Sequence, residues 1–256
     1  MPKTRPFASR LSDFVRSEHP NLFGCSRAVL LLLSASVLVA APPPARQLSG
    51  DLFILGRLKY AGGGDWYSNP SSLPNLLEFL HEQTGMPTAE KEVNVAPSDP
   101  AIFNTPYLYM NGHGRITFSD EDAANLRRFL TSGGFLHADD NYGMDESFRK
   151  EIKKVFPDLE LQEVPYSHPI YHSFFDFPNG PPKIHEHDGK PAQGFGIFYQ
   201  GKLVVYYTYQ SDLGDGWEDP DVHHDPEEVR LQALKMGVNI IMYALRRQEF
   251  TAKDKD

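Results

Sequence analysis

The sequence contains a single cysteine, Cys25, among its 256 residues. Residues 51–256 therefore cannot form an intrachain disulfide, a zinc site built from thiolates or a cysteine nucleophile. Positive charge is also scarce there. The chain has a net charge of −9, and residues 1–50 carry six basic and two acidic side chains, which leaves −13 for residues 51–256. An acidic body does not attract phosphate backbones over long range, so we expect no nucleic-acid partner.

Long apolar runs and common hydrolase motifs are missing as well. The apolar stretch 28–41 has fourteen residues, fewer than the roughly 20 that a membrane-spanning helix needs. Arginines precede it and three prolines follow it, an order typical of an export signal. We expect a location in the periplasm or cell envelope, with membrane contact only through this segment if it is not cleaved.

The motifs G-x-S-x-G and H-E-x-x-H do not occur, which removes the commonest hydrolase and metalloprotease signatures.

Strand and helix patterns alternate after the proline-rich residues 42–48. Patterns typical of strands occupy residues 52–60, 92–95, 107–110 and 135–138. Helices are expected to begin at Ser72, at the capping box that starts with Ser119, at Asp145 and at Asp225. Residues 194–199 and 203–209 flank a short turn and predict a hairpin.

This alternation predicts a parallel sheet covered by helices on both faces, with the hairpin as an antiparallel edge. The expected fold class is α/β, a three-layer α/β/α sandwich with a mostly parallel, flavodoxin-like sheet. We expect one such domain over residues 51–248. Residues 1–50 would form the export signal and a linker, and residues 249–256 a disordered tail.

Ligands of open α/β sheets bind at the carboxyl ends of the strands, which selects four segments. The loop after the first strand holds Tyr60, Asp65 and Trp66 around three glycines that permit close backbone approach. A flexible turn with a packed tryptophan explains this loop equally well. In the second segment, Asn111 and His113 follow another strand. The glycines on both sides of His113 favour a histidine that faces a ligand.

The third segment contains two adjacent carboxylates, Asp139 and Asp140, at the end of a strand. Adjacent carboxylates repel each other unless they are hydrogen-bonded, metal-bound or solvated. They are therefore candidates for catalysis or for holding a divalent metal, with His113 and His168 as further ligands or proton carriers. The alternative is that one of them caps the following turn.

The fourth segment, residues 210–228, has eight carboxylates in nineteen residues. Asp212, Asp215 and Trp217 are candidates for ligand binding here. An oxygen-rich loop that binds a hard cation is the alternative, but the segment does not fit the EF-hand spacing, and a solvated acidic loop is the favoured interpretation. The carboxylates of that alternative are Asp212, Asp215, Glu218, Asp219 and Asp221. Separately, the pair His185 and His187 could face a metal from one strand, but its surroundings favour an exposed loop.

Residues 111–141 resemble the glutamine amidotransferase-like superfamily, in which a glycine-rich strand end, a helix ending in Gly-Gly and a further strand precede the catalytic Gly-x-Cys-x-Gly elbow. The corresponding residues here are His137-Ala138-Asp139-Asp140-Asn141. An aspartate stands about where the cysteine would be. Because an aspartate cannot form the required thioester, the resemblance implies the fold without amidotransferase activity.

A larger part of the chain, residues 51–246, is similar to an uncharacterised bacterial family, domain of unknown function 4159. The resemblance rests on Arg57-Leu58-Lys59-Tyr60 with Gly64-Asp65-Trp66, Gly133-Gly134-Phe135-Leu136 with Asp139-Asp140, His168-Pro169, and Asp212-Leu213-Gly214-Asp215 with Trp217. It implies an amidotransferase-like fold in an envelope protein and brings no established reaction. A looser resemblance to trehalose-utilisation proteins implies carbohydrate as a ligand class.

Two functions follow from these patterns. The first is an exported binding or scaffold module for a small polar or carbohydrate-like ligand, or for an envelope protein, with a rim formed by Tyr60, Trp66 and Trp217. The second is a metal-assisted hydrolase that uses Asp139 and Asp140 with nearby histidines. A divalent metal is the one cofactor that the sequence suggests.

Overall fold

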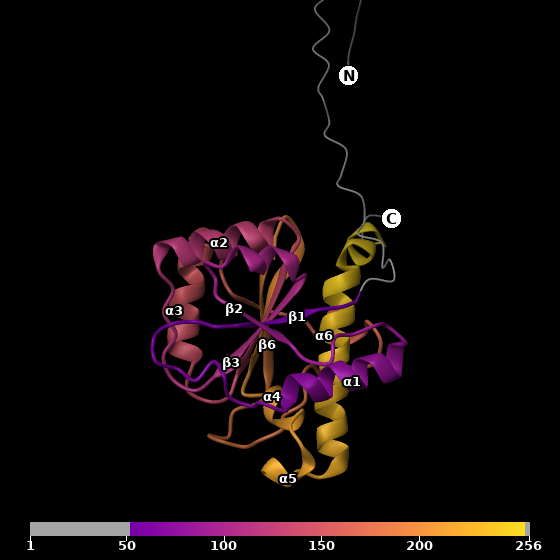
Figure 1. Ribbon diagram of the computed structural model, residues 1–256. Coiled ribbons are helices and arrows are strands. Elements are labelled where there is room, and N and C mark those ends of the chain that lie inside the picture. The colour runs from indigo at the N-terminus through magenta and orange to yellow at the C-terminus, as the bar shows by residue number, and fades with distance from the viewer. Residues whose placement is uncertain (1–51, 254–256) are drawn as a thin grey trace, which may run out of the picture. The chain divides into compact units, whose positions relative to one another are not determined.

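The computed structural model describes residues 52–253, and Figure 1 shows their arrangement. The expected export segment and linker, residues 1–50, lie outside the described residues. Within residues 52–253, no helix is both long enough and apolar enough to cross a membrane.

A seven-stranded sheet forms the centre of the fold, in the order β2-β1-β3-β4-β7-β6-β5. The parallel strands are β1 (Leu55–Leu58), β2 (Val93–Val95), β3 (Tyr107–Gly112), β4 (Phe135–Asp140) and β7 (Lys202–Tyr209). The antiparallel edge consists of β6 (Gln193–Tyr199) and β5 (Gln162–Glu163). The predicted mostly parallel sheet with an antiparallel edge hairpin is confirmed.

Helices cover both faces of this sheet (Figure 1). On one face lie α1 (Ser72–Thr84) and α6 (Glu227–Lys253), and on the other α2 (Asp120–Thr131) and α3 (Asp145–Val155). The loops contain four short helices: η1 (Pro100–Asn104), η2 (Pro169–Tyr171), α4 (Leu213–Gly216) and α5 (Pro220–His223). Apolar residues at helical spacing explain how the long helices pack, as in α1, where the leucines at 73, 76, 77 and 80 are all buried. The three-layer architecture is confirmed.

Local signals in the sequence set several helix ends. Ser119 and Asp122 form the predicted capping box at the start of α2. Gly85 ends α1 in the left-handed conformation. The prediction that Ser72 caps α1 is wrong, because the cap position is Ser71 and the Ser72 hydroxyl donates to the carbonyl of Asn69.

The C-terminal helix also differs from the prediction. Both carboxylate oxygens of Asp225, the expected cap, lie beside a ring nitrogen of His185. Helix α6 runs through residues 249–253, which were expected to belong to a disordered tail.

The sheet order determines where a ligand site is expected. From β1 the chain first moves outward to β2 and then back across to β3, so the strand order reverses beside β1. Loops at the carboxyl ends of such strands diverge, which is where ligands bind in open α/β sheets. Strand β4 is two residues longer than predicted, because Asp139 and Asp140 pair in register with Asn111 and Gly112 of β3.

Candidate metal centre

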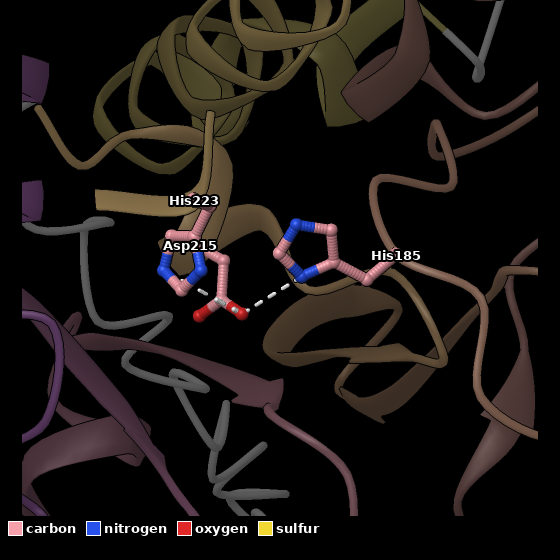
Figure 2. A group of neighbouring side chains, drawn as sticks. All are labelled: His185, Asp215 and His223. Atoms are coloured by element: carbon pink, nitrogen blue, oxygen red, sulfur yellow. Dashed lines mark hydrogen bonds and ion pairs between the residues drawn. The ribbon is translucent and has the colours of Figure 1, made fainter. Parts of the chain in front are cut away.

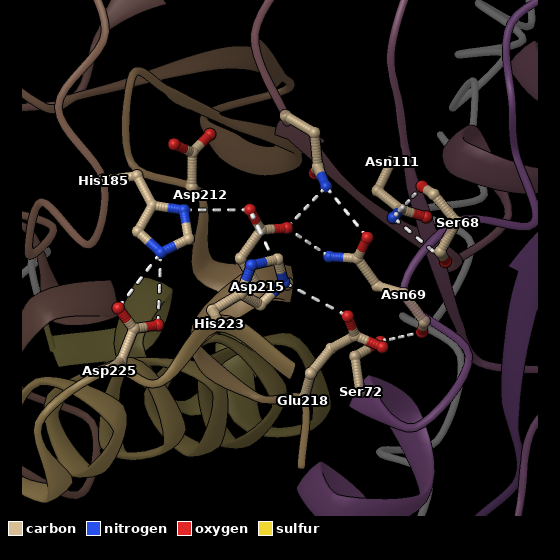
Figure 3. A network of polar contacts seen from close by, with 12 residues as sticks. Ser68, Asn69, Ser72, Asn111, His185, Asp212, Asp215, Glu218, His223 and Asp225 are labelled. Carbon is tan, nitrogen blue, oxygen red and sulfur yellow. Dashed lines mark hydrogen bonds and ion pairs between the residues drawn. The ribbon is translucent and has the colours of Figure 1, made fainter. Parts of the chain in front are cut away.

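A network of polar side chains joins the loops at this edge of the sheet (Figure 3). Asp215 of α4 lies at its centre. In Figure 3 its carboxylate lies between His185, which comes from the loop before β6, and Asn69, which comes from the loop after β1. Segments as far apart as 146 positions along the chain therefore meet at one carboxylate.

His185 lies between two carboxylates. Its Nδ1 is 3.0 Å from Oδ2 of Asp215, and its Nε2 is 3.1 Å from both carboxylate oxygens of Asp225. The hydrogen bond with Asp215 raises the pKa of His185 to about 9, although burial opposes this rise. Both nitrogens of the ring therefore have a carboxylate partner, which defines the orientation of the imidazole.

His223 of α5 approaches the same carboxylate from the other side (Figure 2). Its Nε2 is 4.0 Å from Oδ2 of Asp215 and 3.2 Å from Oε2 of Glu218. The ring centroids of His185 and His223 are 5.0 Å apart. One ligand atom from each of His185, Asp215 and His223 lies within 4.8 Å of the others, so these three residues form a group that could hold a metal ion.

The second oxygen of Asp215 is held by two amides. Nδ2 of Asn69 donates to Oδ1 at 2.5 Å, and Nδ2 of Asn141 donates to it at 2.8 Å. Burial opposes ionisation of Asp215, but hydrogen bonds with His185 and Asn69 outweigh it and lower the pKa. The buried guanidinium of Arg57 in turn donates to the backbone carbonyls of Ser68 and Asn69. The loop that supplies Asn69 is thus anchored to β1.

Two buried acceptor atoms in this network have no hydrogen-bond donor among the described residues: Oδ1 of Asn141 and Oδ1 of Asp212. Asn141 and Asp212 are 1% and 0% exposed. The other Asp212 oxygen lies 2.5 Å from Nε2 of His187, and burial together with the nearby Asp139 raises the pKa of Asp212 to about 8. Buried polar atoms without a hydrogen-bond partner are rare, and a bound ion or water molecule is one kind of partner that satisfies them.

Asp139, a predicted catalytic and metal-binding residue, has a structural environment instead. It is fully buried. Oδ1 accepts from the hydroxyl of Thr208, and Oδ2 accepts from the N–H of Gly214 and the hydroxyl of Tyr109. Burial raises its pKa to about 7 against the effect of these hydrogen bonds. With donors on both oxygens, Asp139 connects β4 to the first turn of α4.

Asp140 and His168 also lie outside the cluster. Oδ1 of Asp140 accepts from the N–H of Met144, which confirms the alternative that one of the paired aspartates caps the following turn. His168 accepts from the N–H of Ile170 at the start of η2. Its ring packs against Phe198 and Tyr243, in β6 and α6, so its predicted grouping with Asp139 is not found.

The predicted aromatic rim is wrong at two of its three positions. Trp217 is fully buried and donates from Nε1 to the carbonyl of Ala233 in α6. Tyr60 is 4% exposed, and its hydroxyl donates to the carbonyl of Asn111. Trp66 is half-buried beneath the ammonium group of Lys59.

The other predicted residues of this edge form a separate group. Oδ1 of Asn111 accepts from Arg57, and its amide donates to Ser68, so Asn111 is buried and has partners on both sides. His113 is exposed and pairs with Asp65. No described contact places His113 among the metal-binding candidates, where it was predicted.

The acidic segment is less solvated than its composition indicates. The side chains of Asp212, Glu218 and Asp215 are 1%, 5% and 12% exposed, so the favoured interpretation as a solvated loop is wrong for these three residues. His185, which was expected in an exposed loop, is central to the cluster. The sequence offered Glu218 only as part of a possible hard-cation loop and His223 only as part of a histidine pair in the acidic segment, and it did not select Asn69 or Asp225 as site residues.

Comparisons with known proteins agree with the family resemblance. The model of the family described as "Domain of unknown function (DUF4159)" matches residues 54–245, which include every residue of the candidate centre. The search of curated proteins found no match. The match spans most of the chain, and the protein therefore belongs to the DUF4159 family.

Proposed function

We propose that this domain binds a divalent transition-metal ion such as Zn²⁺ through His185, Asp215 and His223 and uses it for hydrolysis. The observation that carries this proposal is the convergence of three ligand atoms within 4.8 Å from two loops, one before β6 and one after β7. Two imidazoles and one carboxylate are a ligand set of catalytic zinc sites, which keep one position open for water or substrate. Oε2 of Glu218, 3.2 Å from His223, is placed to become a further ligand.

The partners of the three ligands support the same function. Metal-bound histidines commonly donate their second N–H to a carboxylate, and metal-bound carboxylates are themselves hydrogen-bonded. Asp225 is the carboxylate partner of the second ring nitrogen of His185. Asn69 and Asn141 donate the hydrogen bonds to the carboxylate of Asp215. The oxygens of Asn141 and Asp212 that have no donor are suited to form hydrogen bonds with metal-bound water.

A metal ion at this position would lower the pKa of a bound water molecule and supply hydroxide for attack on a substrate. The substrate we propose is small and polar or carbohydrate-like. The sequence predicted Asp139 and Asp140 as metal ligands. We propose instead that the ligands are His185 in the loop before β6 and Asp215 and His223 in the loop after β7.

The location of the domain is part of the proposal. The basic and then apolar order of residues 1–41 supports export to the periplasm or envelope. The strand order, with Asp139 at the end of β4 where an amidotransferase-like protein would have its nucleophile, supports an amidotransferase-like origin without amidotransferase chemistry.

A binding or scaffold module is the second candidate. Tyr67 and Tyr142 are 65% and 45% exposed and follow β1 and β4 at the same edge. Exposed tyrosines of this kind can stack on the apolar face of a sugar and hydrogen-bond through their hydroxyl groups. A domain that binds oligosaccharides but no metal would favour this candidate.

Metal analysis of the purified protein tests the first candidate. We expect one equivalent of zinc per chain by elemental mass spectrometry after purification without chelator and dialysis against Zn²⁺. His185→Ala and His223→Ala should each weaken zinc binding more than about 100-fold, since even outer-sphere partners contribute 10- to 100-fold. His172→Ala is the matched control, because His172 pairs with the exposed Asp176 elsewhere in the chain. Zinc well below one equivalent, or equal affinity in all three variants, would refute a metal centre here.

A further inference from the structure

A second histidine–carboxylate pair lies at the same edge of the sheet, outside the candidate metal centre. Oδ1 of Asp65 accepts from the backbone N–H of His113, and Oδ2 lies 3.1 Å from Nδ1 of the same residue. One carboxylate therefore holds both the backbone and the ring of this histidine. Burial opposes ionisation of Asp65, but the hydrogen bonds with His113 outweigh it and lower its pKa.

The second ring nitrogen of His113 is available. The side chain is 55% exposed, and Nε2 has no hydrogen-bond partner among residues 52–253. The tautomer with its proton on Nδ1 donates to Asp65 and presents the lone pair of Nε2 to solvent. A general base requires such an accessible lone pair, because it must accept a proton from the reacting group.

The backbone around the pair is shaped to bring the two residues together. Gly112 has a φ of +138°, and a Cβ atom there would lie 3.0 Å from Oδ1 of Asp65. A Cβ atom on Gly64 would lie 2.8 Å from the carbonyl oxygen of His113. Glycine at these positions lets the loop after β1 pack directly against the loop after β3, which places Asp65 against His113.

The pair and the metal centre share one loop. Residues 61–70 carry Asp65, which holds His113, and also Asn69, which holds Asp215. This loop follows β1 beside the reversal of strand order, where ligands of such sheets bind. His113 therefore lies at the edge of the sheet where ligands of this fold class bind.

We infer that His113 is a catalytic general base, positioned by Asp65, that takes a proton through Nε2 from water or a hydroxyl group attacking a carbonyl substrate. In ester hydrolysis, the oxygen of water forms a bond to the carbonyl carbon while its proton moves to Nε2. The bond to the leaving oxygen then breaks, and that oxygen departs with the electron pair. The imidazolium, stabilised by Asp65, returns its proton to solvent. This step requires no metal.

Hydrolysis of p-nitrophenyl acetate by the full-length, chelator-treated protein tests the inference. We expect His113→Gln to lower kcat/KM about tenfold or more. His172→Gln is the matched control, because His172 also pairs with a carboxylate through Nδ1 but its Nε2 is bonded to the carbonyl of Tyr166. The control should hydrolyse the ester like the wild type. Equal rates for wild type and His113→Gln would overturn the inference.

The positioning of His113 by Asp65 is tested by a measurement that a loss of structure would not change in the same way. In ¹⁵N-detected imidazole spectra, we expect His113 of the wild type to be the Nδ1–H tautomer, and Asp65→Asn to show mixed tautomers with an unchanged melting temperature. A wild-type His113 in the Nε2–H form would overturn the positioning role. Both experiments are done with chelator-treated protein, so their outcome is separate from that of the zinc measurements.

Discussion

Asp139 and Asp215 lie at the same edge of the sheet, yet their surroundings differ. Asp139 receives hydrogen bonds on both oxygens from a hydroxyl pair and a backbone N–H. Asp215 receives amide N–H groups on one oxygen only, and its other oxygen faces two histidines. Hydroxyl and backbone donors on both oxygens make Asp139 part of the framework, whereas the Asp215 oxygen that lies beside two imidazoles is placed to share a metal ion with them.

The two aspartates therefore offer a direct contrast between stability and binding. Substitutions at Asp139 should affect folding, and substitutions around Asp215 should affect metal affinity. The following predictions are ordered from the largest expected effect to the smallest.

Asp139→Ala should be the most destabilising of these changes. It removes the acceptor of the buried N–H of Gly214 and of the buried hydroxyl of Tyr109. Each buried donor left unsatisfied costs about 1–3 kcal/mol, so we expect the free energy of unfolding to fall by about 4 kcal/mol. Urea denaturation at about pH 4, where burial of the carboxyl group does not oppose folding through its charge, measures it. Asp158→Ala at an exposed position is the control. A loss below about 1 kcal/mol would contradict the structural role.

Asp139→Asn should change how stability depends on pH. The folded pKa of about 7 is above the ordinary value of 3.8, so between these values the folded state binds a proton that the unfolded state does not. Wild-type stability should fall as pH rises from about 4 to about 7, while an asparagine contributes no such fall. The stability of the variant relative to wild type should increase by up to about 4 kcal/mol over that window. Denaturation at a series of pH values measures this difference, and a constant difference would argue against a raised pKa.

Asp225→Asn should weaken zinc binding without unfolding the domain. Its carboxylate contacts Nε2 of His185, the nitrogen opposite the proposed metal ligand atom. Loss of such a partner costs about 10- to 100-fold in metal affinity. Zinc titration by calorimetry measures the change. Asp221→Asn, an exposed residue of α5 with the same change in charge, is the control, and equal affinities of the two variants would show that Asp225 does not support a metal ligand.

Asp140→Ala should have the smallest effect. It removes one acceptor from the N–H of Met144, but it also removes the repulsion between Asp140 and Asp145. Loss of a capping acceptor costs about 1 kcal/mol, and relief of repulsion offsets part of it. Urea denaturation should therefore show a loss of about 1 kcal/mol or less, with zinc affinity unchanged. A large drop in zinc affinity would instead restore Asp140 as a ligand.

Much of the fold could be predicted because the signals are local. The capping box at Ser119, the left-handed Gly85 and the hairpin turn at Gln200–Gly201 each involve residues that are close in sequence. The length of β4 could not be predicted, because its last two residues become strand only by pairing with β3.

The candidate site could be predicted only in part. The rule for α/β sheets selected the edge at which the candidate metal centre lies, and Asp215 was among the candidates. The wrong assignments share one cause: composition does not report burial. Trp217 was expected at the surface and lies in the core, and His185 was expected in an exposed loop and lies between two carboxylates.

By itself the sequence determined the alternation of strands and helices, the cysteine-free chemistry of residues 51–256 and the edge of the sheet where polar side chains gather. Only the tertiary structure decided which carboxylates accept hydrogen bonds from hydroxyl and backbone groups on both oxygens and which lie beside histidines. The physical reason is that the free energy of a buried carboxylate depends on its donors and charged neighbours. For Asp215 these are Asn69, Asn141 and His185, which are 146, 74 and 30 positions away along the chain.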